Sequence, residues 1–227
     1  PKATESTDTS SDTETTSATE TPSDTSSDTS STSDTTSQSD TDTTSQNANS
    51  LPDGVTMEDP SLTPPNVQYA QSALLMDMAS GRVLYSKNLD ERVYPASTTK
   101  IMTALLTLEN LNLSQVVTIK HDITFPDGAA VAIHLKKGDK ITVEALLNAL
   151  IIMSANDAAV ALGEAVAGSE ANFVKMMNKR AKELGATNTH FANSSGLPDE
   201  NHYSSAKDMA LIFREGLKNK DFRSVLG

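Results

Sequence analysis

The first fifty residues contain almost nothing that a core could bury, so a fold must be built from the residues after them. In this stretch the apolar side chains other than proline are three alanines, and Asp or Glu occurs ten times against one lysine. Apolar burial is needed to offset the entropy that a chain loses on folding. The sequence therefore predicts a disordered, hydrated Ser/Thr/Asp-rich stalk over residues 1–50. The alternative is a low-complexity tract without a function.

The rest of the chain predicts a linker followed by one α+β domain. Residues 51–66 contain four prolines and predict an extended linker, which leaves residues 67–227 for the domain. About 160 residues can bury a sizeable core. Alternating and apolar patterns predict strands at 72–77, 82–86, 116–119 and 130–133. Helical periodicity predicts helices from 97 and over 143–153, 157–167, 169–184 and 206–218.

A serine and a lysine stand three residues apart at the start of the first predicted helix, in Ser97-Thr98-Thr99-Lys100. Positions i and i+3 share a helix face, with Cβ atoms about 5–6 Å apart. Serine is a poor nucleophile unless a base activates it, and lysine can be that base where burial favours its neutral form. The pair therefore indicates nucleophilic catalysis, whereas the alternative is a helix N-cap followed by a surface lysine.

The same pattern occurs again in Ser204-Ser205-Ala206-Lys207, so it is not specific by itself. Here we expect Ser205 to cap the helix that begins at Ala206, with Lys207 solvated in its first turn.

A polar tripeptide, Ser154-Ala155-Asn156, joins two apolar helices. Polar groups beside a core are costly unless they find partners. We therefore expect this junction to serve the same site as Ser97, the alternative being a simple N-cap for the following helix.

Together, these motifs resemble the Ser-x-x-Lys and Ser-x-Asn motifs of penicillin-binding proteins and serine β-lactamases. Residues 94–104, 152–159, 191–198 and 202–210 resemble, in order, blocks of the low-molecular-weight D-alanyl-D-alanine carboxypeptidases, serine peptidase family S11. The resemblance implies a β-lactamase/transpeptidase-like α+β fold, in which helices pack on an antiparallel sheet.

The resemblance also implies a role for each motif residue. Ser97 is expected to be the nucleophile and Lys100 the general base, while Ser154 relays a proton and Asn156 binds the substrate's amide backbone. The implied substrate is a peptidoglycan stem peptide that ends in D-Ala-D-Ala, and β-lactams are the implied covalent inhibitors. The division of base duty between Lys100 and Ser154 stays open.

The family's third motif, a Lys-Thr-Gly on a strand beside the site, has no counterpart in this sequence. The sequence also begins without an initiator Met or a hydrophobic signal region. We therefore expect a fragment at both ends, incomplete at its C-terminus and inactive alone, since the resemblance implies that the missing strand supplies part of the oxyanion hole. One such donor is worth about 10²–10³ in rate.

Charge and residue types exclude several other classes of function. The net charge of −12 argues against nucleic acid, which needs clustered Lys and Arg. With no cysteine and four scattered histidines, we expect no metal and no cofactor. No run of residues is apolar enough to cross a bilayer. The resemblance implies an extracytoplasmic protein of the bacterial cell envelope, secreted or membrane-anchored through parts outside this chain.

Two rival functions remain at this point. One is a non-catalytic envelope protein in which a decayed domain of this family binds peptidoglycan on a stalk. The other is a serine β-lactamase, against which stands the lack of a Glu-x-x-Leu-Asn segment.

Overall fold

The computed structural model describes residues 55–59, 61–126 and 130–227. The stalk predicted for residues 1–50 lies outside these ranges, as do residues 51–54 and 60 of the predicted linker.

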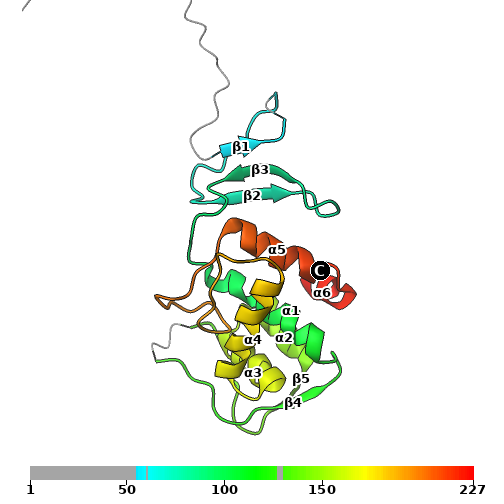
Figure 1. Cartoon of the computed structure of the whole chain (residues 1–227). Coiled ribbons are helices and arrows are strands. Elements are labelled where there is room, and N and C mark those ends of the chain that lie inside the picture. Colours follow the sequence, from blue (N-terminus) through cyan, green and yellow to red (C-terminus); the bar gives the residue numbers. More distant parts are fainter. Residues whose placement is uncertain (1–54, 60, 127–129) are drawn as a thin grey trace, which may run out of the picture. The chain divides into compact units, whose positions relative to one another are not determined.

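A small antiparallel sheet forms the N-terminal part of the described chain (Figure 1). Strands β2 (Ala73–Met76) and β3 (Val83–Lys87) form the predicted hairpin. Strand β1 (Val55–Met57) pairs with the other edge of β3, so the linker prediction is wrong for these three residues. A hydrogen bond of 2.6 Å between the hydroxyls of Thr56 and Ser86 accompanies this pairing, which gives the Val-Thr-Met segment a partner that the sequence did not indicate.

Four helices supply most of the side chains in the main core. They are α1 (Lys100–Asn110), α2 (Val143–Ile152), α3 (Asn156–Ala167) and α4 (Glu170–Glu183). Their inward side chains are fully buried, among them Met102, Leu146, Leu162, Phe173 and Met177. On α4, Phe173 and Met177 are the large apolar side chains that point into this core.

The connection between α1 and α2 differs from the prediction. Strand β4 (Val116–Thr118) was predicted, but its partner is β5 (Lys140–Thr142), directly before α2. The prediction of a strand at 130–133 is wrong, because the backbone of this segment is hydrogen-bonded to the start of α3 and not to a neighbouring strand. Asn156 N–H donates to the carbonyl of Val131 at 2.8 Å, and Ile133 N–H donates to the Asp157 carboxylate at 3.1 Å.

Two helices close the described chain, α5 (Ala206–Gly216) and α6 (Lys220–Leu226). Helix α5 packs against β2, where the Arg214 guanidinium donates to the carbonyls of Met78 and Ala79 at 3.0 Å each. Helix α5 therefore links the sheet to the helices that carry the site.

Candidate active site

Ser97 lies in a tight turn that leads into α1. This turn is the 3₁₀ helix η1 (Ala96–Thr99), and α1 follows without a break from Lys100. In a 3₁₀ turn, side chains at i and i+3 eclipse one another. The Ser97 Oγ and Lys100 Nζ atoms accordingly lie 3.2 Å apart, so the predicted pair is in hydrogen-bond contact.

Burial changes the acid–base character of Lys100. The residue is only 2% exposed, and burial lowers the pKa of its amine to about 8. Its Nζ donates to Asn156 Oδ1 at 2.8 Å and to the carbonyl of Ser195 at 2.6 Å. The protonated amine also donates to Ser97 Oγ at 3.2 Å, and loss of that proton leaves two N–H donors for these acceptors and a lone pair that faces the Ser97 hydroxyl. The site thus accommodates the neutral amine without an unpaired group.

Ser154 contacts the nucleophile candidate from the junction of α2 and α3. Its Oγ donates to Ser97 Oγ at 3.0 Å. The N-cap of α3 is Ala155, which makes no side-chain cap bond, so the simple N-cap interpretation of Ser154 is wrong. The Ser154 backbone has φ +56°, a left-handed conformation that costs about 1–3 kcal/mol and is concentrated at functional sites. This conformation turns the hydroxyl toward Ser97.

Asn156 lies at the first position of α3 and is 6% exposed. Its Oδ1 accepts a hydrogen bond from Lys100 Nζ, whereas the family resemblance implies a contact with substrate. The amide oxygen therefore holds the lysine, and the amide N–H₂ remains the group with which Asn156 could bind a substrate.

The carbonyl of Ser195 is a part of the site that the sequence analysis missed. Its loop follows α4 and is held close to η1 by Gly196, which has φ +84°. A Cβ built on Gly196 would lie 1.8 Å from the carbonyl oxygen of Ala96, so only glycine fits. The sequence did contain Asn193-Ser194-Ser195-Gly196, within the block at residues 191–198 that resembles the family. The types of side chain in a segment do not show which of its backbone carbonyls will accept a hydrogen bond.

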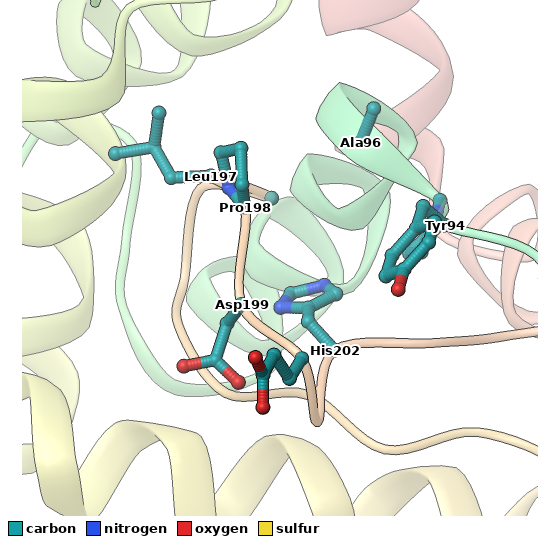
Figure 2. A pocket seen from close by; sticks show the side chains of 9 residues that line it. Tyr94, Ala96, Leu197, Pro198, Asp199 and His202 are labelled. Carbon is teal, nitrogen blue, oxygen red and sulfur yellow. The ribbon is translucent and has the colours of Figure 1, made fainter.

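Two hollows flank the Ser97 turn. One, of about 330 Å³, is lined by Ser97, Lys100 and Ser154 together with apolar side chains of α1, α2, α5 and α6. The other, of about 450 Å³, lies between Tyr94–Ala96 and the loop from Gly196 to Glu200, with His202 in its wall (Figure 2). Both hollows therefore border the turn that carries Ser97, one at Ala96 and the other at Ser97 itself.

The second Ser-x-x-Lys sequence does not join this site. Ser205 caps α5, accepting a hydrogen bond from the N–H of Asp208 at 3.2 Å, as predicted. Lys207 lies 3.2 Å from the Asp90 carboxylate, with 45% of its side chain exposed. Ser204 is buried and hydrogen-bonded to Thr189.

Within the described ranges, no cluster of three or more His, Cys, Asp or Glu side chains has metal-binding geometry. In the same part of the chain, none of the helices is long and apolar enough to span a membrane.

Comparison with solved structures defines the class of protein. The chain aligns with the D-alanyl-D-alanine carboxypeptidase DacD from Francisella tularensis at a TM-score of 0.66 and 33% identity, over 75% of this chain and 43% of that one. It aligns with penicillin binding protein 5 from Haemophilus influenzae at a TM-score of 0.63 and 38% identity, over 70% and 48%. The fold is that of the penicillin-binding DD-peptidases, which confirms the predicted fold class.

Sequence comparison then gives the family. Residues 58–225 match the model of peptidase family S11, described as D-alanyl-D-alanine carboxypeptidase. DacF of Bacillus subtilis (strain 168), a D-alanyl-D-alanine carboxypeptidase, is 45% identical over 161 residues. The chain belongs to this family, as the motifs predicted. The match covers 70% of this chain and 41% of DacF, so the chain spans about two fifths of that relative.

Proposed function

We propose that the protein is a serine-type D-Ala-D-Ala carboxypeptidase that trims peptidoglycan stem peptides through a Ser97 acyl-enzyme. The observation that carries this proposal is the contact of Ser97 Oγ with both Lys100 Nζ, at 3.2 Å, and Ser154 Oγ, at 3.0 Å. A nucleophile in contact with a buried base is the arrangement that acyl transfer requires. The names of the relatives, D-alanyl-D-alanine carboxypeptidases, supply the substrate class.

In this mechanism the neutral Lys100 amine takes the proton of the Ser97 hydroxyl as Ser97 Oγ attacks the carbonyl of the terminal D-Ala-D-Ala bond. The C–N bond breaks, and the leaving D-alanine amine receives a proton by way of Ser154, which contacts Ser97 at 3.0 Å. Water then attacks the ester carbonyl, the bond to Ser97 Oγ breaks, and the peptide now ending in a single D-Ala is released while the Ser97 hydroxyl is regenerated. With a pKa of about 8, about one Lys100 amine in ten is neutral at pH 7.

Asn156 has two roles in this proposal. Its amide oxygen, 2.8 Å from Lys100 Nζ, fixes the base, and its N–H₂ group binds the backbone of the stem peptide. The backbone N–H of Ser97 supplies one oxyanion donor, and the strand with the family's Lys-Thr-Gly supplies the other. β-Lactams acylate Ser97 because their strained amide presents a similar carbonyl and carboxylate.

The site of action proposed here is outside the cytoplasm, because peptidoglycan stem peptides lie there. The acidic Ser/Thr/Asp-rich stretch at residues 1–50 then acts as a hydrated spacer between an anchor, outside this chain, and the catalytic domain. Proximity to the membrane or wall is part of this proposal.

The proposal is tested by incubating the native-length protein with penicillin, measuring its intact mass and mapping the modified peptide. An adduct on Ser97 that is lost in Ser97→Ala supports it, and Ser204→Ala, in the second Ser-x-x-Lys sequence, is the matched control that keeps the adduct. Lys100→Ala is expected to slow acylation about 10²–10⁴-fold. A wild-type protein that binds peptidoglycan without an adduct would instead be the decayed binding module, and fast turnover of penicillin would indicate a β-lactamase.

A further inference from the structure

A buried histidine contacts the turn that carries Ser97. His202 is 2% exposed and lines the 450 Å³ hollow beside Tyr94 and Leu197 (Figure 2). Its Nε2 lies 2.8 Å from the Thr99 hydroxyl, although the two residues are 103 positions apart in the sequence. No role for His202 follows from the acyl-transfer mechanism described above.

The contacts of the ring determine which nitrogen carries its proton. The backbone N–H of Ala192 donates to His202 Nδ1 at 3.2 Å, so Nδ1 accepts with its lone pair and carries no proton. A neutral imidazole with an unprotonated Nδ1 carries its hydrogen on Nε2. Nε2–H therefore donates to Thr99 Oγ1, and the edge-to-face contact with Phe191, at 5.7 Å between ring centroids, holds the ring in this orientation.

Thr99 is well placed to transmit this contact to the reacting groups. It is fully buried and stands between Ser97 and Lys100 in η1, directly before α1. A shift of the turn changes the 3.2 Å contact between Ser97 Oγ and Lys100 Nζ. Misplacement of reacting groups by about 1 Å costs about 10²-fold in rate.

We propose that His202 is a positioning residue for acyl transfer, which, as the neutral Nε2–H tautomer, anchors Thr99 and so holds Ser97 against Lys100. This inference rests on the proposed acyl-enzyme mechanism, but the tautomer of His202 can be measured without any reaction. If His202 served only to pack the core, either tautomer would be compatible with that role, and protonation of His202 would not change the rate of acylation.

Protonation of His202 breaks the arrangement, because an N–H at Nδ1 would face the N–H of Ala192. Burial lowers the pKa of His202 from its usual 6.5, and the charge of Asp199 opposes that shift while His190 adds to it. Glu200 is the other carboxylate that lines the same hollow. The anchor is thus intact above pH 6.5 and is lost only as the pH falls through the lowered pKa of His202.

The test compares His202→Gln, His202→Leu and Thr99→Val with the wild type in the native-length protein. Glutamine can donate to Thr99 and accept from Ala192 without titrating, whereas leucine can do neither. We expect His202→Leu and Thr99→Val each to slow acylation by penicillin about 10–100-fold with little change in penicillin affinity. Their double variant is no slower than either single one, because both remove the same contact, and His202→Gln restores most of the rate.

The pH profile separates positioning from packing. In a plot of the logarithm of the acylation rate against pH, the titration of Lys100 gives a slope of one below the pKa of its amine. In the wild type, protonation of His202 adds a second break, which makes the plot steeper again below pH 6.5. His202→Gln is expected to keep the first slope and lose the second break. His190→Gln, which removes the neighbouring, exposed histidine, is the control that keeps both.

Nitrogen NMR of the His202 ring in the unmodified wild type gives a reading independent of activity. Protonation at Nε2 supports the inference, and protonation at Nδ1 overturns it. Additive rate losses in the double variant, or a wild-type second break that survives in His202→Gln, would also overturn it. If the wild type forms no adduct at all, the proposed function has failed, and the positioning role fails with it even where the NMR reports the Nε2–H tautomer.

Discussion

Replacing Asn156 by aspartate tests whether Lys100 is the base, because it places a negative charge beside that amine, although it also removes the N–H₂ group proposed to bind substrate. The Asn156 Oδ1 atom lies 2.8 Å from Lys100 Nζ, and aspartate places a carboxylate oxygen at nearly the same point. At this separation and an effective dielectric constant of about 20, two unit charges attract by about 6 kcal/mol before desolvation is subtracted. Close opposite charges shift measured pKa values by about 1–3 units.

The expected result is a displaced pH profile. In the wild type, burial lowers the pKa of Lys100 to about 8, so acylation rises about tenfold between pH 7 and pH 9 as the amine loses its proton. In Asn156→Asp the pKa rises to about 9–11, which lowers the rate at pH 7 by about 10–1,000-fold. The loss is recovered at higher pH, where the amine becomes neutral again.

The assay is the rate constant for acylation of the native-length protein by penicillin from pH 6 to pH 10.5, corrected for spontaneous hydrolysis. Asn112→Asp, which adds the same charge at an exposed position, is the control and keeps the wild-type profile. A profile of Asn156→Asp that rises at the same pH as the wild type would refute Lys100 as the titrating base. A lower plateau with an unmoved midpoint would show that Asn156 acts on the substrate alone.

Two further substitutions test how the site is held in place. Gly196→Ala is expected to destabilise the fold by at least about 2 kcal/mol and to slow acylation about 10²-fold, because its Cβ would lie 1.8 Å from the Ala96 carbonyl. Asp157→Ala is expected to lower the free energy of unfolding by about 2–5 kcal/mol, since its buried carboxylate accepts from the N–H groups of Ile133 and Leu135. Urea unfolding measures both free energies.

Each of these substitutions has a matched control. Gly168 has φ +81° and nothing within 4 Å of a built Cβ, so Gly168→Ala measures the backbone strain without the clash. Asp139 accepts one N–H bond, from Lys136, at an exposed site, so Asp139→Ala is expected to cost less than about 1 kcal/mol. If a substitution and its control lowered the free energy of unfolding equally, the clash at Gly196 or the buried hydrogen bonds of Asp157 would not be the cause of the loss.

Local sequence was sufficient for features that depend on neighbouring residues. The contact of Ser97 with Lys100 follows from their spacing in one turn, and the cap at Ser205 follows from its place before an amphipathic helix. Short elements were harder to predict. The seven-residue helix α6 and the three-residue strand β5 are too short to show a clear periodicity, and the segment at 130–133 has a strand-like composition but no strand beside it.

The sequence by itself determined the family, the positions of the helices that carry the motifs and the pairing of Ser97 with Lys100. Only the tertiary structure decided what surrounds that pair. It brings Asn156 and the Ser195 carbonyl, 56 and 95 residues away, onto the same amine. Burial sets the pKa of Lys100, and burial is a property of the packed helices around it. Residue identities do not show which backbone carbonyls or how little solvent surround a side chain, and for this reason the sequence could propose Lys100 as the base but could not describe its environment.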